Sequence, residues 1–525
     1  MNSNIMQVMT AMILYMAAVI MIGVLYAKKA NRNSEAFFLG GRSLGPWITA
    51  MSAEASDMSG WLLMGLPGVA YWCGIADAAW VAIGLAIGTY FNWLITSKRL
   101  RRYSIKAKNA ITLPEFFSNR FKEAKPVILM ISAFFILVFF TVYASSCLVT
   151  CGKLFSTLFG ASYISMMLVG ALFVLLYTIL GGFLAESASD FMQAIVMITA
   201  LVVIVVISTA KAGGLGEVYE NAKSIPGFLD FFGMASPSLD SAGVQIAENG
   251  KAVFGEAKNY SVLTICSSLA WGLGYFGMPQ VLLRFMAIRK ENELKASRRI
   301  AMVWVVISLA VAVFIGIVGR QLFPTVHTTA SSAENIFITL STNFLPPILA
   351  GFVMAGILAA TISSSDSYLL IAASAFAKNI YQGALKKKAS DKEVMVMSRI
   401  TLLVITVIAV LIALDENSII FSIVSFAWAG FGATFGPIML FSLFWKRTTK
   451  EGAVAGMISG GVMVFVWKLL ISKIGGVFAI YELLPAFIIS SIVIVAVSLA
   501  TKKPSAEIEA EFEAVRTGAE DVVDA

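Results

Sequence analysis

Long apolar segments recur along the whole chain, and no other feature constrains its fold as strongly. A helix needs about 20 consecutive apolar residues to cross the hydrocarbon core of a bilayer. Of the 525 residues, 58% are hydrophobic and only 13% are charged. The segments do not alternate at every second residue, as the strands of a membrane β-barrel do. The sequence therefore predicts an all-α polytopic membrane protein.

We expect about thirteen transmembrane helices, numbered here as spans 1 to 13. The N-terminal apolar segment is too long for a cleavable signal peptide and lacks a basic start, so we expect it to remain as span 1. The spans are expected at residues 6–26, 45–70, 77–96, 127–151, 162–180, 190–210, 259–282, 300–322, 346–377, 398–414, 418–444, 452–472 and 480–500.

Lysine and arginine are concentrated on one side of the predicted membrane. Most of the 39 such residues follow spans 1, 3, 7, 9 and 11 or lie in the C-terminal tail. Cytoplasmic loops carry an excess of these residues, so we expect the N-terminus outside the cell membrane and the C-terminus in the cytoplasm. The net charge of +8 arises from these loops and does not indicate nucleic-acid binding.

Spans 2 and 7 are interrupted by small and polar residues at membrane depth. They contain SAEASDMSGWLLMGLPG and SSLAWGLGYFGMP. In transporters, two Gly/Pro-interrupted helices at matching positions indicate inverted repeats around a substrate site. We therefore expect a 5+5 inverted-repeat core, formed by spans 2–6 (45–210) and spans 7–11 (259–444). The other segments are span 1 with a cytoplasmic loop (1–44), an extracellular loop (211–258), spans 12 and 13 (445–503) and an acidic cytoplasmic tail (504–525), expected to be solvated and partly disordered or loosely helical.

The cysteines and the single histidine do not indicate a catalytic site, disulfides or a zinc site. His327 is expected to be solvated in a loop, and no nucleophile, base and orienting group can be assembled around it, so an enzyme is not predicted. The four cysteines are expected to be small buried side chains rather than disulfides or zinc ligands: Cys73, Cys147, Cys151 and Cys266.

Asp57 is the first candidate functional residue. An acid near the bilayer centre costs several kcal/mol, so its presence indicates function. An acid that merely reaches water or a lysine from a helix end fits poorly, because Asp57 lies well inside span 2. Glu54, three residues earlier, either shares an aqueous pathway from the cytoplasm or reaches a basic residue.

A run of hydroxyls in span 9 is the second candidate. In AATISSSDSYLL, Ser363, Ser364, Ser365 and Ser367 surround Asp366. Single serines in membrane helices often bond to their own backbone, which is the alternative for Ser365. Hard cations prefer several oxygen ligands, and hydroxyls with carbonyls of an unwound helix would supply them for sodium.

Other candidates allow two interpretations each. Asp190, beside Glu186, is either a helix N-cap or an ion-handling acid. Trp271 and Tyr275 flank the break in span 7, and with Tyr143 in span 4 they either pack or line a pocket.

At these residues the chain resembles the sodium/solute symporter family, and within it the branch that carries proline. The matching stretches include FFLGGRSLGPWITAMSA, ASDMSGWLLMGLPG, LGGFLAESASDFMQA, AWGLGYFGMPQVLLRFMA and ILAATISS. The resemblance covers about residues 8 to 500. It implies an inverted-repeat fold, thirteen spans and sodium-coupled uptake of L-proline, with no organic cofactor.

The resemblance also implies roles for individual residues. The sodium ligands would be the carbonyl oxygens of Ala55, Met58 and Ala360 and the hydroxyls of Ser363 and Ser364. Asp57 matches an essential acid near that site. The residues matching positions that tune affinity or line the proline pocket are Ser59, Gly60, Tyr143, Trp271, Tyr275 and Pro279, and those matching sensitive cytoplasmic positions are Arg42 and Asp190.

Glu54 and Asp366 depart from the proline branch, where the residues at these positions are uncharged. Some relatives bind a second sodium ion near this part of span 9 with the acid that matches Asp190. Asp190, Asp366 and Ser367 are therefore candidates for a second cation or proton site, with Glu54 on a cytoplasmic ion path. Alternatively, Asp366 only faces a cytoplasmic water cavity.

Other functions stay open at this point. The chain could carry another small amino acid or a carboxylate, or couple transport to protons. A channel or a transporter-like sensor is a further alternative, although no kinase or receiver-like segment follows residue 500.

Overall fold

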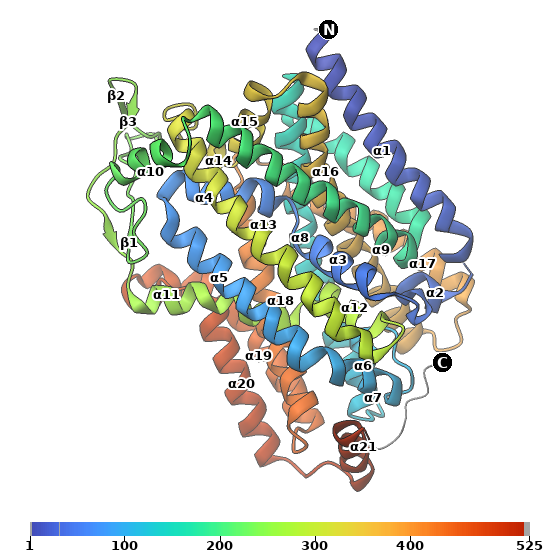
Figure 1. The fold of residues 1–525 in the computed structure, drawn as a ribbon. Coiled ribbons are helices and arrows are strands. Elements are labelled where there is room, and N and C mark those ends of the chain that lie inside the picture. Colours follow the sequence, from blue (N-terminus) through green and yellow to red (C-terminus); the bar gives the residue numbers. More distant parts are fainter. Residues whose placement is uncertain (1–2, 31, 519–525) are drawn as a thin grey trace.

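The computed structural model describes residues 3–30 and 32–518, and this part of the chain is mostly helical (Figure 1). The helices are α1 Ser3–Ala30, α2 Ser34–Leu39, α3 Pro46–Asp57, α4 Leu66–Cys73, α5 Ile75–Phe91, α6 Ser97–Lys106, α7 Leu113–Arg120, α8 Val127–Phe159, α9 Tyr163–Lys211, α10 Leu215–Lys223, α11 Val262–Leu269, α12 Pro279–Ala287, α13 Leu294–Leu322, α14 Ala330–Ala333, α15 Ile336–Phe344, α16 Pro347–Ser374, α17 Asp391–Ile412, α18 Ile420–Phe444, α19 Lys450–Val466, α20 Leu483–Ala500 and α21 Ala506–Thr517.

Shorter elements connect or extend these helices. There are 3-10 segments at Gly40–Arg42, Ala270–Gly277, Glu291–Glu293, Ser472–Ile474 and Gly476–Phe478, and π-helical segments at Trp61–Gly65, Asn92–Thr96, Ala375–Leu385 and Trp467–Ile471. Two antiparallel strand pairs form in the loop after α9, β1 Gly233–Met234 with β4 Lys258–Asn259, and β2 Ala247–Glu248 with β3 Lys251–Ala252.

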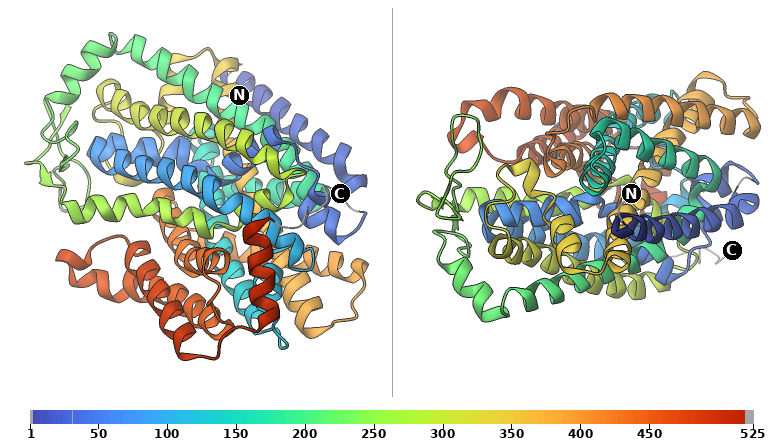
Figure 2. Two further views of the ribbon diagram at one scale, coloured as in Figure 1. Left: turned by 60° about the horizontal axis from the view of Figure 1, so that its bottom comes forward. Right: turned by 90° about the horizontal axis from the view of Figure 1, so that it is seen from above.

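The helices lie side by side in a bundle whose two ends differ. The strands and α10 lie at one end, whereas α2, α6, α7 and α21 lie at the opposite end (Figure 1). Helices α19 and α20 form one flank of the bundle (Figure 2). The predicted extracellular loop and the predicted cytoplasmic segments are therefore at opposite ends.

Ten helices in the described residues are long and apolar enough to cross a membrane, and an eleventh is added if α11 and α12, bent by 44°, form one span. The protein is thus a multi-pass membrane protein. The predicted spans 2 and 5 contain only shorter apolar helices, Trp61–Cys73 and Tyr163–Ile179. The count of thirteen therefore remains a prediction.

Span 2 breaks where the sequence predicted. Helix α3 ends at Asp57, and Met58 leaves the helical region with ψ of 80°. The Ser59 amide then donates to the Asp57 carbonyl instead of continuing the helical pattern. Gly60 is needed here, since a Cβ atom at this position would lie 2.4 Å from the Thr150 hydroxyl oxygen of α8.

Span 7 also breaks as predicted, although it ends later than residue 282. A 3-10 segment follows α11, Met278 is extended, and Pro279 begins α12, where its missing N–H is tolerated. Gly274 allows close contact, because a Cβ atom there would lie 2.0 Å from the Trp428 indole nitrogen. Helix α12 continues to Ala287, so its polar residues belong to the bundle and not to a loop.

Several expectations were wrong in detail. Helix α9 continues through a kink at Gly182, so Asp190 lies inside a helix and is not an N-cap. His327 is buried rather than solvated, with its Nε2 atom 2.9 Å from the Thr339 hydroxyl. Among the cysteines, Cys266 is exposed, while the other three are buried. The tail forms α21, which buries Phe512, and residues 519–525 lie outside the described residues.

Candidate functional site

Oxygen atoms from α3 and α16 converge where α3 ends. The Ser363 hydroxyl lies 2.8 Å from the Ala55 carbonyl oxygen and 3.2 Å from that of Ala360, and the Ser364 hydroxyl lies 3.3 Å from the Ala55 oxygen. All four residues are fully buried. Four of the five oxygen ligands predicted for sodium are thus brought together, although they come from positions some 300 residues apart.

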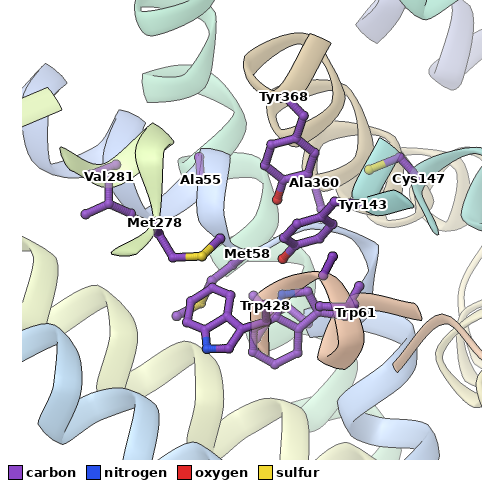
Figure 3. Packing of buried hydrophobic residues seen from close by; sticks show 14 of the residues in the cluster. Ala55, Met58, Trp61, Tyr143, Cys147, Met278, Val281, Ala360, Tyr368 and Trp428 are labelled. Carbon is purple, nitrogen blue, oxygen red and sulfur yellow. The ribbon is translucent and has the colours of Figure 1, made fainter. Parts of the chain in front are cut away.

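The helix break explains why the Ala55 carbonyl is free for these contacts. In a continuous helix this carbonyl would accept the amide of Ser59, which here donates to Asp57. Met58, the fifth predicted ligand, forms the end of α3 and is buried beside Ala55 and Ala360 (Figure 3). An unwound helix end of this kind exposes carbonyl oxygens that a cation can use.

The Asp57 side chain points to span 7 rather than to the serines. The Tyr275 hydroxyl donates to Oδ2 of Asp57 over 2.8 Å, and the Gln280 amide donates to Oδ1 over 3.2 Å. The Tyr143 hydroxyl and the Trp61 indole both donate to the Asp57 carbonyl oxygen. Asp57 therefore ties the break in span 2 to the break in span 7. The sequence did not indicate Gln280 as a partner of Asp57. Its position in α12 is what identifies it.

Aromatic rings enclose Trp271. Its ring stacks on Phe421 at 5.2 Å and on Tyr481 at 5.0 Å, measured between centroids. The Trp428 indole donates to the Trp271 carbonyl oxygen and contacts the Tyr275 ring edge-on at 5.0 Å. The predicted pocket residues Trp271 and Tyr275 are therefore neighbours in a closed aromatic cluster. Sequence reasoning missed Phe421, Trp428 and Tyr481.

The other predicted pocket residues border the same region. The Tyr143 ring contacts the Tyr368 ring in a tilted arrangement, with centroids 4.2 Å apart, and Trp61 and Trp428 lie close by (Figure 3). Ser59 is buried at the end of α3, and Pro279 begins α12. Thr150 of α8 packs directly against Gly60, so this glycine allows close packing of the two segments.

A buried arginine joins four helices one turn of α12 beyond Gln280, on the side of the predicted cytoplasmic segments. Arg284 of α12 is fully buried and pairs with Glu186 and with Asp190, whose Oδ2 atom lies 3.2 Å away. It also donates to Ser52 of α3 and Ser367 of α16 over 3.0 Å each. The sequence could have indicated Arg284, because it lies in the apolar run VLLRFMA of span 7, but that run was assigned to a loop.

Asp366 and Ser367 lie at the edge of the Arg284 cluster. The Ser367 amide donates to Asp366 Oδ1 over 2.8 Å, and the Ser367 hydroxyl donates to Glu186. A cavity of about 10 Å³ borders Glu186 and Asp366. No cluster of three or more His, Cys, Asp or Glu residues in the described chain has the geometry to hold a metal ion.

Glu54 and Arg42 lie apart from this cluster. Glu54 Oε1 accepts the Trp93 indole hydrogen over 3.2 Å, and no ion pair with a basic residue is found for Glu54 in the described part of the chain, while the aqueous pathway stays a prediction. Arg42 donates to Asn109 and to the carbonyl oxygens of Ala110 and Met286. Arg42 therefore connects the loop after span 1 with the segments that follow spans 3 and 7.

A second buried ion pair closes the opposite end of the bundle. Glu334 accepts from Lys153 of α8 over 2.8 Å and from the amides of Ile420 and Phe421 at the start of α18 over 3.0 Å each. Phe421 in turn stacks on Trp271. The aromatic cluster is thus covered on the side of the predicted extracellular loop.

Comparisons with known proteins agree on one family. A model of the sodium:solute symporter family matches residues 37–460. The chain is 40% identical over 493 residues to the osmoregulated proline transporter OpuE of Bacillus subtilis, with 94% of each chain covered. It is 39% identical over 508 residues to a sodium/proline symporter of Staphylococcus aureus strain USA300, covering 96% of this chain and 94% of that protein.

Solved structures show a similar fold. A Na⁺-coupled sialic acid symporter in a substrate-bound outward-open state superposes with a TM-score of 0.74 at 17% identity, covering 95% of this chain and 99% of that one. A transporter of the nucleobase-cation-symport-1 family in a closed conformation gives a TM-score of 0.52 at 14% identity, covering 91% and 98%.

Proposed function

Since the chain belongs to the sodium:solute symporter family, we propose that it takes up L-proline together with sodium by alternating access. The convergence of the Ala55 and Ala360 carbonyls with the hydroxyls of Ser363 and Ser364 carries this proposal. Two relatives that cover almost the whole chain are named for proline, and this favours proline as the solute.

Sodium would bind between α3 and α16. The Ser363 and Ser364 hydroxyls now donate to the Ala55 carbonyl. With the ion present, their hydrogens would rotate away so that the oxygen lone pairs and the carbonyls all face the cation. Hard cations prefer oxygen ligands, and this set consists of carbonyl and hydroxyl oxygens. Met58 would complete the set through its carbonyl, at the non-helical end of α3.

The coupling of sodium binding to the conformational change follows from the positions of the sodium ligands in the chain. Ala55 belongs to the first predicted repeat and Ser363 to the second, so bound sodium favours the conformation in which the two repeats are close at this point. A ligand shifts such an equilibrium only through its different affinity for the two states. Each sodium charge that enters also gains about 2.3 kcal/mol per 100 mV of membrane potential.

Proline would bind on the other side of the break, in the region of Trp271 and Tyr275. Its ring would pack on the Trp271 indole, which requires Phe421 to move aside. Its carboxylate would accept amide hydrogens exposed at the broken helices. The Asp57 contact with Tyr275 would transmit the state of the sodium site to this pocket, since Asp57 lies two residues after Ala55.

The Arg284 cluster would form the cytoplasmic barrier and ion path. Arg284 compensates the charges of Glu186 and Asp190, which leaves Asp366 as the acid available for a second cation or a proton. The expected orientation, with the N-terminus outside and the C-terminus in the cytoplasm, places this cluster where sodium would leave. The proposed transporter has thirteen transmembrane spans and a 5+5 inverted-repeat core.

Uptake by purified protein in proteoliposomes tests the function. We expect labelled proline to accumulate under an inward sodium gradient and not when choline replaces sodium, whether or not a proton gradient is present. Excess unlabelled proline should block this uptake, whereas other small amino acids and carboxylates should block it much less. Accumulation driven by protons alone, or no proline uptake at all, would contradict the proposal.

A further inference from the structure

Tyr481 contacts the predicted proline pocket from outside the two predicted repeats. It lies in the short loop before α20, the helix of span 13. Its ring is nearly parallel to the Trp271 ring, with an interplanar angle of 19° and a centroid distance of 5.0 Å. A face of Trp271 is therefore supported by a residue that neither repeat contains.

Two hydrogen bonds hold Tyr481 in this position. Its amide donates to the Ser267 hydroxyl over 2.7 Å, one turn before Trp271 in the chain. Its phenol donates to the Ser425 carbonyl oxygen over 2.6 Å, within α18. The ring is thus fixed at both ends, to α11 and to α18.

Leu483, the residue after Glu482, strengthens the contact between Tyr481 and Trp271. Leu483 packs against α18 at Gly432, where a Cβ atom would lie 2.7 Å from the leucine side chain and 2.8 Å from the Cα atom of Gly274. Glu482 is buried, and Lys468 lies 3.6 Å from its carboxylate. The start of α20 is therefore anchored against the 3-10 segment that contains Trp271.

Three rings stack on Trp271, those of Phe421, Tyr481 and Trp428, and the first two differ in how they are held. Phe421 is on the first turn of α18 and is held through its own amide, which donates to Glu334. Tyr481 is held by its amide and its phenol on two different helices. Tyr481 is thus held through its side chain as well as its backbone, whereas the Phe421 ring has no such side-chain hydrogen bond.

We propose that Tyr481 is a positioning residue that sets the size of the substrate pocket by fixing the plane and depth of the Trp271 ring. This inference rests on the proposed transport of a cyclic amino acid. Stacked aromatic pairs have specific geometry and contribute beyond their buried area. With Tyr481 in place the wall fits a five-membered ring, and without it Trp271 can retreat to admit a larger one.

Uptake of three cyclic amino acids tests this proposal: azetidine-2-carboxylate, proline and pipecolate, with four-, five- and six-membered rings. For Tyr481→Ala we expect the KM for proline to rise about tenfold, which corresponds to about 1.4 kcal/mol. The ratio of kcat/KM for pipecolate to that for proline should rise by a similar factor. Tyr481→Phe keeps the stack and loses only the bond to Ser425, so its ratio should shift much less than that of Tyr481→Ala.

Two controls separate positioning from general damage. Phe478→Ala removes an exposed ring from the same loop, one that contacts Trp467 and not Trp271, and it should leave the ratio unchanged. The sodium concentration that half-saturates thermal stabilisation without proline should be the same in Tyr481→Ala and wild type, because the Ala55 and Ser363 contacts remain.

The outcomes separate a failure of the role proposed for Tyr481 from a failure of the proposed transport function. A lower kcat in Tyr481→Ala with an unchanged substrate ratio would overturn the proposal. If that variant does not fold, Tyr481→Leu, which fills much of the space without a ring, must show the shifted ratio, and an unshifted ratio there overturns it equally. Failure of the wild type to take up any of the three compounds with sodium would instead contradict the proposed function.

Discussion

The Tyr275 phenol donates a hydrogen bond of 2.8 Å to Oδ2 of Asp57, and this bond joins the two interrupted helices. Asp57 is fully buried, and its two side-chain partners, Tyr275 and Gln280, are uncharged. Hydrogen bonds to a charged group contribute about 1.5–3 kcal/mol. The contact is therefore strong enough to couple the cation site to the substrate pocket.

Removing that phenol should weaken substrate binding while leaving the ring in place. For Tyr275→Phe we expect the KM for proline uptake to rise at least tenfold, since about 1.4 kcal/mol corresponds to a factor of ten. Tyr103→Phe is a matched control, because its buried hydroxyl has no hydrogen-bond partner in the described residues. Equal KM values for the two variants would contradict the role given to the Asp57–Tyr275 bond.

Arg284 should be essential for stability because it compensates two buried acids. Removing one partner of a buried ion pair typically costs about 3–5 kcal/mol. We expect Arg284→Gln to lower the melting temperature of the detergent-solubilised protein strongly. The combined change Arg284→Gln with Glu186→Gln and Asp190→Asn should recover much of the loss, because the two acids that pair with Arg284 are then uncharged.

The control for Arg284 is Arg289→Gln. Arg289 pairs with Glu293 at the surface, where its side chain is 55% exposed, and surface pairs contribute little. We expect the melting temperature of the Arg289→Gln protein to equal that of the wild type. An Arg284→Gln protein as stable as the Arg289→Gln protein would show that the buried cluster is not needed for the fold.

His327 should make the protein less stable in mild acid. Burial, together with the smaller effect of the neighbouring Arg320 charge, lowers its pKa from the usual value near 6.5 to about 4. The unfolded chain therefore binds a proton at a higher pH than the folded protein does. The stability that neutral His327 contributes is complete above about pH 6.5 and is lost as the pH falls towards 4.

Because His327 is the only histidine in the chain, one substitution isolates its effect. We expect the fall in melting temperature between pH 7 and pH 5 to be smaller in His327→Gln than in the wild type. The stability lost at low pH is at most about 3.5 kcal/mol, since each pKa unit corresponds to about 1.4 kcal/mol. Identical pH profiles would contradict the buried, neutral state of this residue.

The sequence predicted the breaks at Asp57 and Pro279 because glycine, proline and polar residues stand out in apolar helices. It also predicted that Ala55 and Ser363 would meet, but only through the family resemblance, because no local pattern brings together residues that lie so far apart in the chain.

Arg284 was missed because span 7 was expected to end at residue 282 and the basic stretch RFMAIRKENELKASRR was assigned to a loop. The apolar residues on both sides of it were the available signal. Tyr481 had no signal at all, because a single aromatic residue in a short loop has no periodicity, and only the packing of α20 on α18 determines its contact with Trp271.

The sodium dependence of Ser363→Ala and Ser365→Ala tests the central claim most directly. Both side chains are buried on the same helix, but Ser363 contacts the Ala55 carbonyl of α3, whereas Ser365 donates only to carbonyls of its own helix. We predict that Ser363→Ala raises the half-saturating sodium concentration for proline uptake at least about tenfold, while Ser365→Ala stays within about twofold of the wild type. Wild-type sodium dependence in Ser363→Ala, or equal shifts in both variants, would contradict a sodium site between α3 and α16.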